Sequence, residues 1–272
     1  MRLVALLTAA TVAAASPLGS GVRYLESHQL ANGGFAEPGG SAYPQLTAWA
    51  VLGVRAANVK PGLLASRYFE QHEDELSTAT DLALVAMAET ALAQQPDRIL
   101  ARLRALERPS GSIGGLVNGT AWAVLAFRTN GRPVDRQTVQ WLLAKQTRSG
   151  GWGWTPGAVD SNDTAAVVQA LRAVRVSGRP IRRALRFLVR YRNADGGFEL
   201  TRGRGSDAQS TAWVIQAFLA AGKRPPRGSL AYLRRLQRKD GSFRYSKRYV
   251  TTPVWVTAQV LPALARQPFP LR

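Results

Sequence analysis

A twelve-residue frame that recurs four times constrains this chain more than any other feature. Each copy has an aromatic residue, a Gln or Arg five positions later, a pair of small residues and a second aromatic residue. The most complete copy is WLLAKQTRSGGW, Trp141–Trp152, and Thr164 opens an apolar run twelve residues after it. The other copies begin at Tyr24, Phe187 and Tyr232. Four copies with the same internal spacing predict a repeat protein.

Two kinds of helix are expected to alternate around this frame. Amphipathic stretches precede the glycine turns, at residues 22–29, 63–72, 97–106, 138–146, 181–192 and 229–238. Stretches that are apolar almost all round follow the turns and begin at Thr47, Thr80, Thr120, Thr164, Thr211 and Thr252. A helix without a polar face has to be covered on every side. The second kind is therefore expected to lie inside the first.

Each inner helix is expected to start at its Thr, because Thr is a favourable N-cap; Ser161, Asp163 and Ser210 are further cap candidates. A small residue follows each Thr by six positions, at Gly53, Ala86, Ala126, Ala170, Ala217 and Ala258. This regularity predicts a close approach between neighbouring inner helices. The Gln of the frame is expected to bind free backbone groups at a helix end, and the paired glycines to allow a positive φ in the turn.

Six such helix pairs make an all-α chain that either forms an open solenoid or closes into a ring. An open array needs polar terminal units, and neither end of this chain has one. The prediction is therefore an α6/α6 toroid, with six helix pairs closed into a barrel, as one domain over residues 16–272. Apolar inner helices would then surround a concave site for an apolar ligand.

The first fifteen residues, MRLVALLTAATVAAA, are typical of a signal peptide. They contain one Arg, an apolar run and small residues at Ala13 and Ala15, which favours cleavage before Ser16. The alternative is a first helix of the domain, although the recurring frame starts only at Tyr24. The interpretation is an exported protein, either secreted or held in the cell envelope.

The charge balance bears on partners. The chain has 36 Lys and Arg against 17 Asp and Glu, a net charge of +19. Such a surplus attracts an anionic membrane or envelope surface, and the alternative is that these cations form solvated helix faces. No nucleic-acid-binding motif accompanies the charge, so nucleic acid is not an expected partner.

Composition also limits the chemistry. The chain has no Cys and two His, which removes thiolate chemistry and Cys-ligated zinc; no metal and no cofactor is expected. Glu89 is the one carboxylate well inside an apolar run, and burial would require a partner such as an Arg.

The frame is similar to the aromatic-Gln-Gly-Trp repeat of squalene and oxidosqualene cyclases, and the turn followed by a Thr-led helix also resembles protein prenyltransferase beta subunits. Both belong to the α6/α6 toroid superfamily, so the resemblance implies that fold. The catalytic zinc of the prenyltransferases looks to be held by Asp, Cys and His, and this chain has no Cys. The exported cobalamin carriers also resemble this architecture and bind without catalysis.

The segment DSNDTA, from Asp160 to Ala165, resembles the D-x-D-D-T-A segment of class II terpene cyclases. In that family a carboxylic acid protonates an alkene or epoxide, and the position of the proton-donating Asp is occupied here by Asn162. Asp160 and Asp163 remain as candidate catalytic acids. The alternative for Asp163 is helix capping.

The lumen of the toroid is expected to be lined by residues two and five positions after each Thr. These include Trp49, Trp122, Trp213, Gln169 and Gln216, with Trp152, Trp154 and Tyr249 as candidates for a ligand-facing rim. An aromatic stripe at helical spacing is also typical of a core.

Two functions stay open at this point. One is an exported binding module for an isoprenoid or other lipidic ligand. The other is a reduced terpene-cyclase-like enzyme that isomerises or cyclises a linear isoprenoid through Asp163 or Asp160. A protein-docking scaffold follows instead if bulky side chains fill the lumen.

Overall fold

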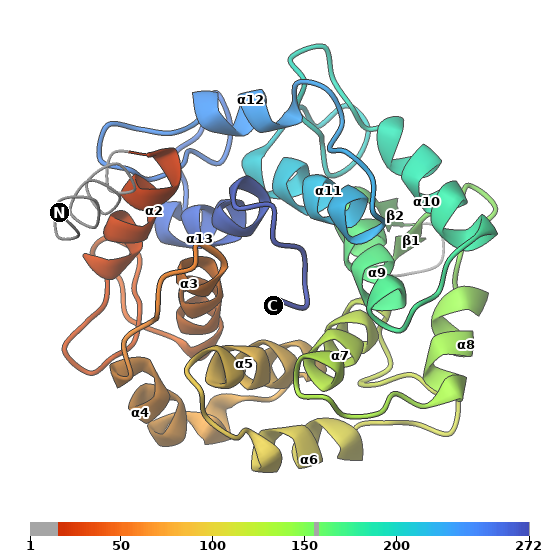
Figure 1. The fold of residues 1–272 in the computed structure, drawn as a ribbon, viewed down its shortest axis with the longest axis horizontal. Helices are drawn as coiled ribbons and strands as arrows, with labels where there is room; N and C mark the ends of the chain where they lie inside the picture. The colour runs from red at the N-terminus through yellow and green to blue at the C-terminus, as the bar shows by residue number, and fades with distance from the viewer. Residues whose placement is uncertain (1–15, 155–157, 272) are drawn as a thin grey trace, which may run out of the picture.

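The computed structural model describes residues 16–154 and 158–271, so the signal-peptide prediction lies outside the described residues. Two concentric layers of helices form a ring (Figure 1). The inner layer consists of α3 (Pro44–Ala56), α5 (Ala79–Ala91), α7 (Val117–Thr129), α9 (Ser161–Ala173), α11 (Ala208–Ala220) and α13 (Pro253–Leu264). The outer layer consists of α2 (Pro17–Glu26), α4 (Leu64–Gln71), α6 (Asp97–Ala105), α8 (Arg136–Ala144), α10 (Arg179–Val189) and α12 (Ser229–Arg235). The described part also has a short 3₁₀ turn, Glu73–Glu75, and a two-stranded ribbon of β1 (Trp152–Gly153) and antiparallel β2 (Val159–Asp160).

The two layers differ in side-chain pattern as the alternation of helices predicted. In α10, Ile181 and Leu188 are buried against the ring, whereas Arg182 and Arg186 are exposed. In α7, almost every residue from Val117 to Phe127 is buried, because the helix is covered by the outer layer on one side and by the lumen contents on the other. The amphipathic helices therefore form the solvent-exposed surface, and the apolar helices form the core.

The ring is closed, because α13 packs against α3. The two helices approach so closely that a Cβ on Gly53 would lie 2.8 Å from the carbonyl oxygen of Ala258. In the outer layer, Gln237 Nε2 donates to the carbonyl oxygen of Pro17 at 2.7 Å and links the end of the chain to its start. The predicted α6/α6 toroid is confirmed, together with the expected tight contact at Gly53.

In four units the Thr is a brace in the first turn rather than the N-cap, so the predicted starts at Thr47, Thr120, Thr164 and Thr211 are wrong. α9 begins at Ser161, and its N-cap is Asp160. Thr164 Oγ1 accepts the backbone N–H of Trp152 at 2.9 Å and donates to the Asp160 carbonyl oxygen at 2.7 Å. The hydroxyl thus ties the glycine turn to the inner helix. Equivalent N–H to Oγ1 bonds join Phe35 to Thr47 (3.0 Å), Ile113 to Thr120 (3.0 Å), Phe198 to Thr211 (2.8 Å) and Phe243 to Thr257 (2.9 Å).

Two units depart from this scheme. In the last unit the brace is Thr257, whereas Thr252 occupies the N-cap position of α13 as predicted, although its side chain makes no capping bond. In the second unit the N-cap is Thr78, which forms a capping box with Asp81, and Thr80 Oγ1 contacts Asn118 Oδ1 instead. The segment before this unit has no glycine turn for a Thr to hold.

The Gln of the frame binds the turn as expected. Gln146 Nε2 donates at 2.9 Å both to the carbonyl oxygen of Gly150 and to that of Pro180 in the next outer helix. Gly150 has a φ of +101°, and a Cβ there would lie 2.8 Å from the Arg183 carbonyl oxygen. Only glycine meets both requirements. The repeated frame is a structural brace.

Candidate functional site

Three tryptophan rings meet inside the ring of inner helices. The ring centroids of Trp49, Trp122 and Trp213 are 5.2, 5.4 and 6.1 Å apart in pairs. They come from α3, α7 and α11, and each pair of these helices is separated by another inner helix. Their contacts therefore cross the axis of the toroid. At this level the lumen is closed by the indole rings.

The C-terminal segment 267–271, here called the tail, is the second occupant of the lumen. It leaves the end of α13 and folds back to the centre of the ring (Figure 1). Phe269 is 3% exposed, and its ring centroid lies 6.0 Å from that of Trp49 and 5.6 Å from that of Trp122. Its backbone N–H donates to Gln169 Oε1 at 2.9 Å. Gln169, expected in the lumen, thus holds the tail.

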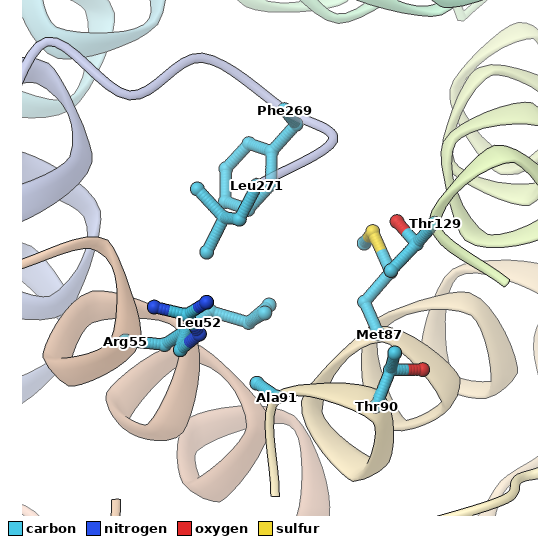
Figure 2. Close-up of a pocket in the computed structure, with 8 residues that line it drawn as sticks. All are labelled: Leu52, Arg55, Met87, Thr90, Ala91, Thr129, Phe269 and Leu271. Atoms are coloured by element: carbon cyan, nitrogen blue, oxygen red, sulfur yellow. The ribbon is translucent and has the colours of Figure 1, made fainter. Parts of the chain in front are cut away.

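Two cavities flank the tail, and Phe269 lines both of them. The smaller, about 110 Å³, lies between the tail and the ends of α3, α5 and α7, where Leu52 and Met87 face Leu271 (Figure 2). The larger, about 530 Å³, lies between the tail and the ends of α7, α9 and α11. The tail therefore divides one mouth of the lumen into two compartments.

Two further glutamines are buried near the tryptophans. Trp213 Nε1 donates to Gln259 Oε1 at 3.1 Å. Gln216 Oε1 and Gln259 Nε2 have no hydrogen-bond partner among the described residues, although each side chain is 1% exposed. Unpaired polar atoms inside an apolar ring are unfavourable and provide polar contacts for a ligand. Gln259 was missed from the sequence because its helix was aligned on Thr252 instead of Thr257.

The two candidate acids, Asp160 and Asp163, lie at the opposite mouth, where the inner helices begin. Asp160 Oδ1 accepts the N–H of Asp163 at 2.8 Å, so Asp160 is the cap and the expectation that Asp163 caps α9 is wrong. Asp163 accepts instead from Asn118 Nδ2 at 2.8 Å. Asn162 is half-buried, and its Oδ1 accepts from Ser161 Oγ at 3.3 Å. Neither carboxylate lines the cavities beside the tail.

Burial changes the acidity of this pair. Burial, together with the charge of Asp163, raises the pKa of Asp160 to about 7, against the lowering effect of the N–H groups of Asp163 and Asn162. Burial also raises the pKa of Asp163, and the hydrogen bond from Asn118 opposes it. The pair therefore retains a proton at a higher pH than exposed carboxylates do.

Other polar residues extend this mouth. Gln45 Nε2 donates to Asp81 Oδ1 at 2.8 Å and links the start of α3 to that of α5. A cavity of about 640 Å³ near the start of α11 is lined by Asp207 and by the exposed Tyr249, among others. Asp207 caps α11, accepting from the Ser210 N–H at 2.7 Å, and burial raises its pKa to about 6. The Asp-x-x-Ser spacing was the available signal for this cap.

The remaining sequence candidates occupy different places. Trp152 is fully buried, and its Nε1 donates to the Leu142 carbonyl oxygen at 2.7 Å, so it braces the wall between α8 and α9 and does not face the rim. Trp154 is 64% exposed. Glu89 accepts from Ser66 Oγ at 3.2 Å rather than from an Arg, and burial raises its pKa to about 7.

Two further features concern the described residues, 16–154 and 158–271, as a whole. No helix there combines the length and the apolar character that crossing a bilayer requires. The same residues contain no group of three or more His, Asp or Glu side chains placed to hold a metal ion.

Comparison with known proteins relates this architecture to a protein family. Residues 106–271 match the family model of the squalene-hopene cyclase C-terminal domain. The drimenyl diphosphate synthase of Streptantibioticus cattleyicolor is 33% identical over 136 residues, which are 46% of this chain and 25% of the relative. The chain thus spans about a quarter of the length of the curated relative it matches.

Two solved structures share the fold over nearly the whole chain. A protein from Actinoplanes has a TM-score of 0.71 at 20% identity, covering 93% of this chain and 98% of that one. A variant of the type II terpene cyclase MstE from Scytonema, solved with its substrate geranylgeranyl dihydroxybenzoate, has a TM-score of 0.71 at 13% identity, covering 92% and 96%.

Proposed function

The chain belongs to the squalene-hopene cyclase C-terminal domain family, and from this we propose that it binds an isoprenoid or similar lipidic ligand in the lumen, where its own tail now lies. The observation that carries the proposal is the nature of the occupant. The ring of Phe269 contacts the rings of Trp49 and Trp122, and the Phe269 N–H donates to Gln169, the one hydrogen bond from the tail to an inner-layer side chain among the described residues.

A flexible apolar chain is a suitable replacement for this tail. Its carbon atoms would contact the rings of Trp49 and Trp122 in place of Phe269, and dispersion with burial would stabilise it as they stabilise the tail. The unpaired amide atoms of Gln216 and Gln259 would contact a polar group of the ligand. The substrate named for the MstE complex contains such a geranylgeranyl chain.

Three observations favour binding over catalysis. The position that matches the family's proton donor is Asn162, and an amide has no acidic proton to transfer. Asp160 is engaged as the cap of α9, and Asp163 is held by Asn118. Both carboxylates lie at the mouth opposite to the one that the tail enters. The ligand is therefore proposed to leave the protein unchanged.

A reduced terpene-cyclase-like activity is the second candidate, because one observation favours it specifically. Burial raises the pKa values of both Asp160 and Asp163, so a protonated carboxyl group persists near neutral pH. Protonation of a carbon–carbon double bond requires an acid that is kept neutral in this way. In this alternative, Asp163 or Asp160 would protonate a linear isoprenoid and start its isomerisation or cyclisation.

Incubation with linear isoprenoids distinguishes the two. Purified protein is mixed with geranylgeraniol, squalene and squalene epoxide, and bound and released species are identified by chromatography with mass spectrometry. Binding predicts unchanged isoprenoid that stays with the protein, to the same extent in an Asp160→Asn/Asp163→Asn variant. A product of unchanged mass and new retention time, absent with that variant, would instead identify a cyclase. If the protein neither retains nor converts an isoprenoid, both proposals fail.

Export and surface attraction complete the proposal. A signal peptide at residues 1–15 would deliver the domain to an exterior where its net charge of +19 favours contact with an anionic membrane or envelope surface. The mature N-terminus, measured by mass spectrometry on protein from an exporting host, is expected at Ser16. A chain that keeps Met1 to Ala15 would contradict export by cleavage.

A further inference from the structure

Four arginines line the larger cavity beside the tail. Arg128 lies at the end of α7, Arg172 and Arg175 at and beyond the end of α9, and Arg266 beyond the end of α13. These four residues are here called the mouth arginines. No carboxylate side chain is among the described residues that line this cavity of about 530 Å³. The concave space therefore concentrates positive charge.

The protein's own carboxylates do not neutralise this charge. Among the described residues, the ion pairs use arginines of the outer layer and its loops, such as Arg102 with Glu73 and Arg104 with Glu107. None involves a mouth arginine. The ends of α7, α9, α11 and α13 carry about −0.5 charge each and so offset about half of the four positive charges. A net positive charge remains in the cavity.

The hydrogen-bonding capacity of the mouth arginines is also largely free. Arg172 is fixed, because its Nε donates to the Ala220 carbonyl oxygen at 3.2 Å and its Nη1 to that of Val176 at 2.7 Å. Arg175 and Arg266 are exposed, and their guanidinium groups have no hydrogen-bond or ion-pair partner among the described residues. The guanidinium groups of Arg175 and Arg266 can therefore use all their N–H donors to bind a ligand.

Backbone conformation fixes the position of two mouth arginines. The second residue after each inner helix has a positive φ, and these six residues are Asn58, Ala93, Gly131, Arg175, Gly222 and Arg266. Glycine or Asn suits this left-handed position, because a Cβ crowds the following carbonyl oxygen. At α9 and α13 the chain carries Arg there, with φ of 65° and 57°. The same conformation ends all six inner helices, Ala93 included, so it belongs to the fold, and at α9 and α13 it places an Arg at this mouth of the lumen.

We propose that the mouth arginines bind a phosphate or diphosphate group, the anionic head of a ligand whose apolar chain enters the lumen. This assignment of the head group rests on the proposed function. Planar guanidinium groups form paired, charge-assisted hydrogen bonds to phosphate oxygens. The cavity adjoins Phe269, so a chain that displaces the tail leaves its head among the arginines.

The test is calorimetric titration of the purified protein with inorganic pyrophosphate at fixed salt. The mouth variant is Arg128→Gln/Arg175→Gln/Arg266→Gln, and Arg172 is kept because it binds two carbonyl groups. The control, Arg179→Gln/Arg182→Gln/Arg186→Gln, removes three exposed charges from α10. The mouth variant is expected to bind at least about tenfold more weakly, because neutral Gln cannot form the paired, charge-assisted hydrogen bonds of the three guanidinium groups that it replaces. Equal weakening in both variants, or no binding by the unaltered protein, would overturn the assignment.

Farnesol and farnesyl diphosphate separate this inference from the proposed function. Tighter binding of the diphosphate, lost in the mouth variant but not in the control, supports both. Pyrophosphate binding at the mouth without any farnesol or farnesyl diphosphate binding keeps the anion site and refutes lipid binding. Equal binding of the two isoprenoids, without pyrophosphate binding, keeps lipid binding and overturns the anion site. If the protein binds phosphatidylglycerol vesicles but neither pyrophosphate nor farnesyl diphosphate, and the mouth variant loses vesicle binding, the proposed diphosphate ligand is overturned in favour of a bilayer lipid.

Discussion

Replacing Phe269 with Ala is expected to lower stability and to release the tail from the lumen. The ring of Phe269 is 3% exposed and contacts the rings of Trp49 and Trp122. Alanine keeps the N–H that donates to Gln169 Oε1, so the substitution tests the contribution of the ring alone.

The size of the effect follows from burial, limited by the freedom of a chain end. Burying about 200 Å² of Phe surface at about 25 cal/mol/Å² contributes about 5 kcal/mol. Detachment of the tail limits this loss, because a free chain end regains backbone entropy, and Pro268 and Pro270 reduce that gain because the free chain is already restricted. We therefore expect a net loss of about 2–3 kcal/mol, which in a domain of this size lowers the melting temperature by about 4–12 °C.

Thermal unfolding followed by circular dichroism measures this loss, and tryptophan emission reports whether the indoles are uncovered. Tyr249→Ala is the control, because that side chain is 58% exposed and its loss is expected within about ±0.5 kcal/mol. A Phe269→Ala protein with an unchanged melting temperature and unchanged emission would refute the conclusion that the ring is seated on the tryptophans.

Three further substitutions test other parts of the structure. Thr164→Val leaves the buried Trp152 N–H without an acceptor and should lower the free energy of unfolding, measured by urea denaturation, by about 1–3 kcal/mol. The control Thr129→Val loses only a bond to Leu125 within its own helix and should lower that free energy by a smaller amount. Gly53→Val places a Cβ 2.8 Å from the Ala258 carbonyl oxygen and should cost about 1–3 kcal/mol; an unaltered urea midpoint would argue against the tight α3–α13 closure. Burial raises the pKa of Asp207 from 3.8 to about 6, so the folded state binds more protons than the unfolded one and loses stability as pH rises through that window. Asp207→Asn keeps a capping side chain but has no carboxyl group to titrate. The melting temperature of this variant, relative to that of the unaltered protein, should therefore rise as pH increases from 3.8 to about 6. A difference that stays constant over this range would contradict the raised pKa.

The repeat frame explains why the ring was predictable. Its residues are the ones that hold each turn, such as Gln146 on Gly150 and Thr164 on Trp152, so their spacing reports the architecture directly. The helix starts were placed late because the first turn of α9, Ser161–Asp163, is polar and resembles a loop. In the last unit the predicted N-cap Thr252 is confirmed, but the brace is Thr257, so the lumen-facing positions that were counted from Thr252 were misplaced.

The contents of the lumen were only partly predictable. The position two residues after the brace indicates that Trp49, Trp122 and Trp213 share a face of their helices. Whether their rings meet depends on the radius of the toroid, which no local pattern encodes. The tail occurs once in the chain and lies outside every repeat, so periodicity carries no information about Phe269. The mouth arginines were hidden for a related reason, because they follow the helix ends and come together only when the ring closes.

Hydrogen exchange of the tail with and without geranylgeraniol tests most directly whether an isoprenoid takes the tail's place. In the free protein, the Phe269 amide is expected to be protected by its bond to Gln169. Binding should remove that protection from the tail while protection of the inner helices is kept or increased. An isoprenoid that binds and leaves the tail fully protected would contradict the account, as would a protein whose tail never shows protection.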